Sequence, residues 1–177
     1  MCSIRYFRLA YHNLVAAKRD FKDYEYDELF LRDAAYNLQQ GVEKALKAFL
    51  ECVGVTVPNT HKIGKLLKMS KDNGSAIIIT EWIKEHSERL EAWEAESRYD
   101  LDFCVELDTI QNAIIEVEKF FNLNGLTYKK DAEITDDVET RLRDLIPVTI
   151  NDTLELNIYY HVFKNKLKSL KDMDLFN

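Results

Sequence analysis

The chain has 177 residues, of which 46% are hydrophobic and 31% are charged, a balance typical of a compact protein with a sizeable core. Only two prolines and five glycines are present, which disfavours a turn-rich all-β fold and favours long helices. The net charge is -7. A general nucleic-acid-binding protein usually carries a basic excess, so any contact with nucleic acid must be local here.

The three cysteines, Cys2, Cys52 and Cys104, are widely spaced and form no CxxC pair. This pattern predicts small buried side chains in a reducing compartment, with neither a disulfide framework nor a metal site. The amino terminus lacks the apolar core of a signal peptide, and the longest apolar run, 76–79, is too short to cross a membrane. We therefore expect a cytoplasmic protein without membrane association and without a cofactor.

Apolar residues recur every three or four positions in the first third of the chain, the spacing of helices with one buried side. The pattern predicts a first helix from Ile4 to Asp23. A second helix is expected between Asp27, a suitable N-cap, and Gly54, a suitable stop. At roughly 1.5 Å per residue, the second helix is long enough to be the spine of a helical bundle.

The middle of the chain predicts three further helices. A short one is expected over 61–70 with Thr60 as its N-cap. A longer one covers 79–97, a break follows at 98–102, and a strongly amphipathic helix covers 103–122.

The last part of the chain predicts a separate helical piece. A linker over 125–131 precedes a short helix near 134–145, and a final helix begins at about Thr153. Two such helices are too small to fold alone, so we expect them to dock on the bundle or on a partner chain. The sequence predicts an all-α protein: an up-down antiparallel bundle of about five helices over residues 1–125 and a C-terminal helical hairpin over 126–177.

Familiar catalytic motifs are missing from the sequence: it has no Gly-rich phosphate loop, no HExxH, no GxSxG and no EF-hand loop. The histidines fall in four different segments, at His12, His61, His86 and His161. Each is interpreted as structural. His86 lies on the apolar side of its predicted helix, where a hydrogen-bonded core histidine is expected.

The polar residues of the second predicted helix form the first candidate site. Glu43 and Lys47 are one turn apart in the favoured order, so a solvated salt bridge explains them without a ligand. Gln39 and Gln40 are hydrogen-bonding residues that can fix the helix against a neighbour. Lys44 adds a second positive charge, so Gln40, Glu43, Lys44 and Lys47 are candidates for contacting a ligand.

Arg98 and Tyr99 form the second candidate site, at a break between predicted helices. An arginine beside an aromatic ring can grip a phosphate bidentately and stack on a base. It can equally pair with Asp100 or Asp102 as an ordinary surface ion pair. The spacing alone leaves both interpretations open.

Three motifs in order resemble the HEPN (higher eukaryotes and prokaryotes nucleotide-binding) domain family. Residues 39–48 (QQGVEKALKA) are similar to its helix signature, residues 58–67 (PNTHKIGKLL) to the opening of its next helix, and residues 97–99 (SRY) to the end of its third segment. The resemblance covers residues from about 4 to 124. Within it, His61 is interpreted as a helix-capping, structural residue.

The resemblance implies an up-down helical bundle, commonly dimeric, in a bacterial or archaeal cytoplasmic protein. Family members often act beside a small nucleotidyltransferase, or as RNA-cleaving toxins in toxin–antitoxin and defence systems. The ribonuclease members carry an arginine followed, after four to six residues, by a histidine. Here Arg98 is followed at those positions by Phe103, Cys104 and Val105, so no general base is evident for activating a ribose hydroxyl.

The sequence therefore supports three hypotheses. The leading one is a non-catalytic HEPN-like protein, a homodimer, that binds a nucleotide, RNA or a partner protein beside Arg98, Tyr99, Lys44 and Lys47. The alternative is a metal-independent ribonuclease, which needs a histidine from elsewhere, such as His161. The third is a partner-binding or scaffolding unit that uses the C-terminal hairpin for recognition.

Overall fold

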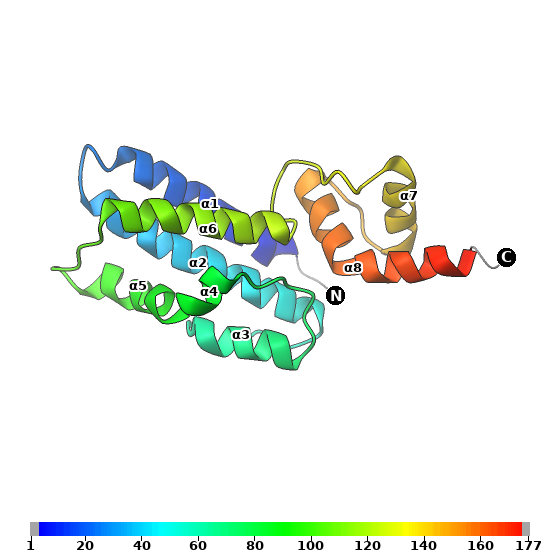
Figure 1. The fold of residues 1–177 in the computed structure, drawn as a ribbon, viewed down its shortest axis with the longest axis horizontal. Coiled ribbons are helices and arrows are strands. Elements are labelled where there is room, and N and C mark those ends of the chain that lie inside the picture. Colours follow the sequence, from blue (N-terminus) through cyan, green and yellow to red (C-terminus); the bar gives the residue numbers. More distant parts are fainter. Residues whose placement is uncertain (1–3, 175–177) are drawn as a thin grey trace. The chain divides into compact units, whose positions relative to one another are not determined.

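The computed structural model describes residues 4–174, apart from the side chains of residues 166 and 168–174, and the described backbone contains helices, turns and loops but no strand. This confirms the predicted all-α class. Among the described residues, no helix is both long enough and apolar enough to cross a membrane. In chain order (Figure 1) the helices are α1 (Ile4–Asp23), α2 (Leu29–Cys52), α3 (Ile63–Asp72), α4 (Glu81–Glu85), α5 (Ser87–Tyr99), α6 (Leu107–Leu123), α7 (Asp136–Leu145) and α8 (Thr153–Asp174).

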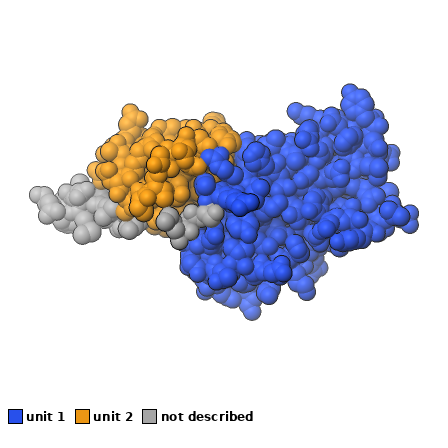
Figure 2. Space-filling view, turned by 180° about the vertical axis from the view of Figure 1, so that it is seen from behind, with its two compact units in different colours: residues 1–120 blue, residues 121–177 orange. Residues whose placement is uncertain are grey.

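The chain divides into two compact units, residues 1–120 and residues 121–177 (Figure 2). Unit 1 contains α1 to α5 and most of α6, and unit 2 contains the end of α6 together with α7 and α8. Each unit has buried apolar side chains of its own. The docking of the hairpin on the bundle or on a partner stays a prediction.

α2 is the central helix of unit 1, and it packs against α1, α3 and α5. Between Leu38 and Leu50 every residue except Lys44 is buried, so this stretch of α2 is covered on nearly all sides. The rings of Phe7 and Phe49 meet edge to face with centroids 4.9 Å apart, which fixes α1 on α2. A helix buried on all sides must satisfy its polar side chains inside the protein.

The first two predicted helices are present, and α1 has the predicted bounds. The N-cap predicted for the second helix is wrong by one residue, because α2 begins at Leu29 and its N-cap position belongs to Glu28. The carboxylate of Asp27 instead accepts a hydrogen bond from the backbone N–H of Leu29 at 2.9 Å, just before the helix. Gly54 follows the end of α2 with a φ of +80°, a left-handed conformation that glycine adopts without strain.

The predicted start of α3 is wrong by two residues. Thr60 was expected as its N-cap, but the N-cap position belongs to Lys62, whose backbone N–H donates to the Thr60 hydroxyl at 3.2 Å. The helix predicted over 103–122 also begins late, at Leu107.

The helix predicted over 79–97 is in fact two helices, α4 and α5, with His86 between them. Both the backbone N–H and the Nδ1 of His86 lie within hydrogen-bond distance of the Trp82 carbonyl oxygen, at 3.0 and 2.9 Å. The His86 ring also stacks on the Trp82 ring, with centroids 4.3 Å apart. These local bonds satisfy the end of α4, so the chain turns although the apolar spacing continues.

The cysteines do not follow the prediction of small buried side chains. Cys104 is a free and exposed thiol. Cys52, the last residue of α2, is half-buried and disulfide-bonded. Cys2 lies outside the described residues.

Unit 2 is a helical hairpin with its own core, formed by Ile134, Leu142, Ile146, Ile150, Leu156, Tyr159, Tyr160 and Leu167. The carboxylate of Asp152 accepts from the backbone N–H of Glu155 at 2.9 Å, and the Glu155 carboxylate accepts from that of Asn151 at 2.7 Å. This reciprocal pair starts α8.

The predicted linker over 125–131 is held on α8 by Asn157, which is 1% exposed. Its amide nitrogen donates to the carbonyls of Thr127 and Lys129 at 2.7 and 2.9 Å, and its amide oxygen accepts from the N–H of Asp131 at 3.0 Å. The backbone of the linker is thus fixed within unit 2 by hydrogen bonds to the Asn157 side chain.

Candidate functional site

The polar residues of α2 form a buried chain of hydrogen bonds, here called the α2 polar ladder (Gln39, Gln40, Glu43 and Lys47). Gln40 donates to the side-chain oxygen of Gln39 at 2.7 Å, and Gln39 donates to Glu43 at 2.8 Å. Lys47 donates to the other carboxylate oxygen of Glu43 at 2.7 Å. The sequence interpretation had the two glutamines fixing α2 against a neighbouring helix. Their hydrogen bonds instead lie within α2.

Glu43 and Lys47 make the predicted i, i+4 pair, but the pair is buried and not solvated: the residues are 3% and 8% exposed. Burial raises the pKa of Glu43, yet hydrogen bonds from Lys47, Gln39 and His61 outweigh it and leave the pKa below its ordinary value. The carboxylate is charged and satisfied by protein groups.

His61 joins the ladder from the loop before α3, with its Nδ1 3.1 Å from the Glu43 carboxylate. Its interpretation as a helix cap is wrong, because α3 begins after Lys62 and His61 instead ties this loop to α2. Residue spacing cannot predict this contact, since the two residues are far apart in the chain and belong to different elements.

Lys44 faces the other way, towards α1. Its ammonium donates to the side-chain oxygen of Asn13 at 2.8 Å, Asn13 donates to Asn37 at 2.8 Å, and Asn37 donates to the buried Asp20 at 2.9 Å. Burial lowers the pKa of Lys44. The structure therefore separates Lys44 from Gln40, Glu43 and Lys47, with which the sequence grouped it.

Arg98 and Tyr99 end α5 and are exposed. The Arg98 guanidinium lies 5.1 Å from the centroid of the Tyr99 ring and 5.9 Å from that of Tyr36, and it pairs with Glu94 at 2.6 Å. The predicted pairing with Asp100 or Asp102 is wrong, because the helix continues through Arg98 and places Glu94 one turn before it. We call this group the Arg98 cluster (Tyr36, Glu94, Arg98 and Tyr99).

Tyr36 and Arg32 are residues that the sequence interpretation missed. Both lie on α2, and Tyr36 is one turn before Gln40, so helical spacing was the only signal for it. Arg32 donates to the carbonyls of Ser97 and Asp100 at 3.1 and 2.7 Å. It thereby satisfies the end of α5 and positions the segment that carries Arg98.

The Arg98 cluster and the histidine end of the ladder are separate places. Tyr36 and Glu43 are seven residues apart on one helix, which is about 10 Å at 1.5 Å per residue. The structure therefore brings Arg98 and Tyr99 together with Tyr36, while Glu43 and Lys47 lie with His61 further along α2.

A pocket of about 500 Å³ adjoins the end of α5, which Arg32 fixes. Its lining includes Arg32, Leu101 and the three residues that follow Arg98 at the histidine positions of ribonuclease members, Phe103, Cys104 and Val105. None of the residues that line this pocket is a histidine, although the lining includes the carboxylates of Glu25 and Glu28. Among the described residues, no group of three or more His, Cys, Asp or Glu side chains is arranged to hold a metal ion.

His161 is buried in unit 2, 6% exposed, and its Cβ lies 3.4 Å from the position that a Cβ on Gly125 would take. Within unit 2, His161 is therefore packed among its neighbours and not exposed to solvent.

The family model described as HEPN domain matches residues 5–144, well over half of the chain. The matched region begins as predicted and extends further towards the C-terminus than the resemblance over 4–124. None of the curated proteins and none of the solved structures compared with the chain gives a match. The chain belongs to the HEPN domain family.

Proposed function

We propose that this protein binds RNA or a nucleotide through the Arg98 cluster without cleaving it. One observation carries the proposal: the exposed Arg98 guanidinium lies against the rings of Tyr36 and Tyr99, while the family's histidine positions hold Phe103, Cys104 and Val105. Family membership supplies the context in which such a site is expected to meet nucleic acid.

The chemistry of the Arg98 cluster suits a phosphate next to a base. A guanidinium offers two parallel donors to phosphate oxygens, and an aromatic ring offers a stacking surface to any base. Tyr99 is 73% exposed, so its ring is accessible. The present partner of Arg98 is Glu94, whose side chain is 14% exposed, while the Arg98 side chain is 46% exposed and keeps donors free for a phosphate.

The ribonuclease alternative lacks a histidine at this site. His86 is twelve residues before Arg98, about 18 Å away along a helix at 1.5 Å per residue. His61 is bonded to Glu43 at the other end of the α2 polar ladder. A general base must reach the proton it takes within one hydrogen bond or one bridging water.

The family resemblance extends the proposal to assembly and location. A homodimer in the cytoplasm, acting beside a small nucleotidyltransferase or in a toxin–antitoxin pair, is the setting that it implies. A partner protein bound by the C-terminal hairpin is the competing proposal, and deleting residues 127–177 would then remove that partner from purified samples.

The test is a titration of fluorescently labelled short RNAs and nucleotides, followed by anisotropy, with Arg98→Ala and Arg143→Ala. Arg143 is a matched control, because it pairs with Glu139 one turn away at 2.7 Å and is exposed to nearly the same extent as Arg98, 45% against 46%. We expect Arg98→Ala to weaken RNA binding about tenfold or more and Arg143→Ala to leave it unchanged. Equal effects of the two substitutions, or no binding by the wild type, would refute the proposal.

The same RNAs, incubated with the protein in excess EDTA and separated on a gel, test the alternative. Intact RNA is the expected result. Cleavage that disappears in Arg98→Ala would establish a metal-independent ribonuclease instead.

A further inference from the structure

A groove of about 550 Å³ lies in unit 1 between α3 and the segment that connects α3 with α4 (Figure 1). Its lining combines three apolar and three basic side chains: Leu67, Ile77 and Ile79, and Lys68, Lys71 and Lys84. Among the described residues that line it, none belongs to the Arg98 cluster or to the α2 polar ladder. We propose that this α3 groove binds an acidic amphipathic segment of a partner protein.

The apolar side chains of the groove are the first reason. α3 packs against α2 and α5, and its Ile63 and Leu66 are 0% exposed. Leu67, by contrast, is only half-buried, and so are Ile77 and Ile79 in the segment that follows α3. Each of the three therefore keeps apolar surface in contact with water, and covering that surface favours the binding of a partner.

The size of the groove allows a partner to reach this apolar surface. Its volume is within the roughly 300–1,000 Å³ that is usual for ligand-binding sites. The groove can therefore take apolar side chains of a partner segment, as interfaces with an apolar centre and a polar rim do.

The lysines of the groove are the second reason. Lys84 pairs with Glu81 at 2.9 Å. The ammonium groups of Lys68 and Lys71 have no carboxylate oxygen within 4.0 Å among the described residues, and both side chains are exposed. Two positive charges beside the apolar surface are thus left for the carboxylates of a partner.

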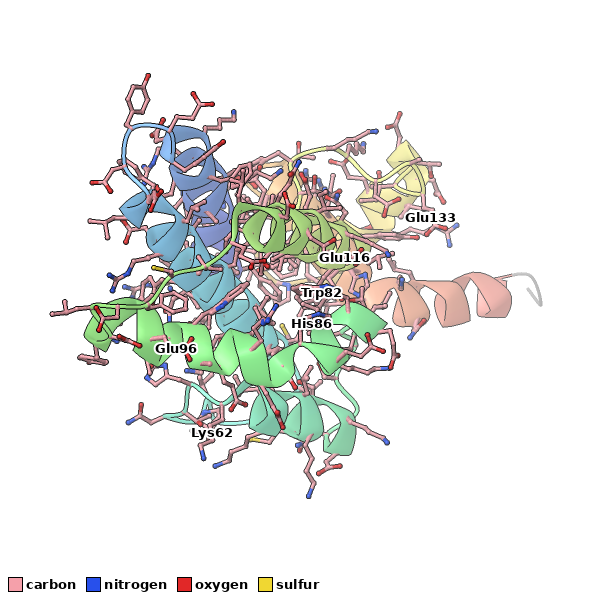
Figure 3. All side chains as sticks on the ribbon, turned by 60° about the vertical axis from the view of Figure 1, so that its left-hand side comes forward. Lys62, Trp82, His86, Glu96, Glu116 and Glu133 are labelled. Carbon is pink, nitrogen blue, oxygen red and sulfur yellow. The ribbon has the colours of Figure 1, made fainter. Side chains whose placement is uncertain are left out.

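The charge of this part of the chain is opposite to that of the whole. Residues 62–80 contain four lysines and one aspartate, in a chain whose net charge is -7. Lys62 lies beside the start of α3 at the outer edge of unit 1 (Figure 3), and Lys65 follows on the exposed side of the helix. Complementary charge steers an acidic partner to a basic surface and disfavours a basic one.

A protein segment fits the α3 groove better than RNA does. Proteins bind single-stranded nucleic acid by stacking its bases on aromatic rings or on arginine. Among the described residues that line the groove, none is aromatic and none is an arginine. An amphipathic segment instead presents apolar side chains to a groove and keeps its charged side chains at the rim. The occupant that matches both halves of the lining therefore carries leucine-like side chains with carboxylates beside them.

The experiment is a selection of short random peptides displayed on phage, with the full-length wild-type chain as bait. We expect the enriched peptides to combine apolar residues with a net negative charge. No enrichment, or enrichment of neutral or basic peptides, would overturn the inference.

Substitutions connect the binding of an enriched peptide, measured by fluorescence anisotropy, to the groove. Lys68→Glu sets a like charge against the peptide carboxylates and is expected to weaken binding about tenfold or more. Lys129→Glu is the matched control, because Lys129 is an exposed lysine of unit 2, and it should leave the affinity unchanged. Equal effects of the two substitutions would show that only the overall charge matters and would refute the inference.

The apolar contribution has a test of its own. Ile77→Ser keeps every charge but removes apolar surface from the groove, so we expect the peptide to bind more weakly than to the wild type. Because Lys68 is exposed, Lys68→Glu keeps the test decisive even if Ile77→Ser fails to fold.

A short RNA, added as a competitor, separates this site from the Arg98 cluster. We expect Arg98→Ala to leave peptide binding unchanged and the RNA not to displace the peptide. If the RNA displaces the peptide and Lys68→Glu weakens both ligands equally, the groove is a nucleic-acid site and the inference is wrong. If Arg98→Ala weakens the peptide and Lys68→Glu does not, the peptide binds at the Arg98 cluster and the inference is wrong as well. RNA binding at the Arg98 cluster is tested independently of these outcomes.

Discussion

Glu43 is the residue on which the interior polar contacts of α2 converge. It accepts hydrogen bonds from Lys47 and Gln39 and is joined by His61 from the loop before α3. A buried carboxylate is stable only with such partners, because removal from water costs a charged group several kcal/mol. The same contacts that satisfy Glu43 fix the loop before α3 against α2.

We predict that Glu43→Gln lowers the free energy of unfolding at pH 7 by on the order of 3 kcal/mol, because it leaves Lys47 buried without its counter-charge. The folded-state pKa of Glu43 lies below the ordinary value of 4.5. Its contribution is therefore present above pH 4.5 and is lost as the pH falls through the folded-state pKa. The difference between wild type and variant should shrink under acid conditions.

Urea unfolding from pH 7 to pH 3 measures this effect, with Glu81→Gln as the control. Glu81 pairs with Lys84 at 2.9 Å on the surface, so its substitution should change stability by less than about 1 kcal/mol. A Glu43→Gln effect of that same small size, or one that does not depend on pH, would contradict the prediction.

For single residues, the sequence predicted the ion pair between Glu43 and Lys47 but not that the pair is buried. The spacing of Glu43 and Lys47 predicts their ion pair, since residues four apart meet on a helix. Burial of the pair depends on α1, α3 and α5 covering α2, and those contacts join residues distant in the chain. Tyr36 and Arg98 meet for the same reason, so the Arg98 cluster could be predicted only in part.

Two glycines at helix ends allow the role of backbone conformation to be separated from that of close packing. Gly54, after α2, and Gly125, after α6, have similar φ angles of +80° and +74°. A Cβ on Gly54 would meet nothing within 4 Å, but one on Gly125 would lie 2.8 Å from the carbonyl oxygen of Asn157 on α8.

We predict that Gly54→Ala destabilises the protein by about 1 kcal/mol, the cost of a left-handed conformation for an L-residue. Gly125→Ala should cost more, on the order of 3 kcal/mol, because it adds a clash with backbone that must move. Guanidinium unfolding of the two variants gives the comparison. Equal losses would show that α8 yields to the extra methyl group without strain.

Helix existence followed from apolar spacing, whereas helix ends depended on side-chain bonds that spacing does not reveal. Both bounds of α1 were predicted correctly, because its periodic apolar pattern ends where the acidic link begins. The division of α4 from α5 was missed, because the bonds from His86 to Trp82 interrupt the helix within an unbroken apolar pattern. Lys62 similarly displaced Thr60 from the start of α3.

For the whole molecule, the two units respond to different pH ranges, because the pKa of Glu43 in unit 1 is lowered and that of Tyr160 in unit 2 is raised. In unit 2, burial and a 2.8 Å hydrogen bond to Glu133 raise the pKa of Tyr160 to about 12, from an ordinary value of 10.0. A raised pKa means that this tyrosine stabilises the fold fully below pH 10 and stops doing so as the pH rises to about 12.

We predict that the wild type loses stability between pH 10 and pH 12 and that Tyr160→Phe, which has no proton to lose, reduces this loss by on the order of 2 kcal/mol. Thermal unfolding followed by far-UV circular dichroism measures the change. Tyr26→Phe is the control, since Tyr26 is 86% exposed and should leave the alkaline loss as it is. A Tyr160→Phe variant with the wild-type pH profile would rule the prediction out.

Because both tryptophans lie in one unit, indole fluorescence and circular dichroism report on different parts of the protein. Trp82 and Trp93 both lie in unit 1, and unit 2 contains no tryptophan. Indole emission therefore follows the surroundings of α4 and α5, while circular dichroism sums the helices of both units. If the two signals change at the same denaturant concentration, the units unfold together. Quenching of the indole emission by an added nucleotide would indicate binding in unit 1.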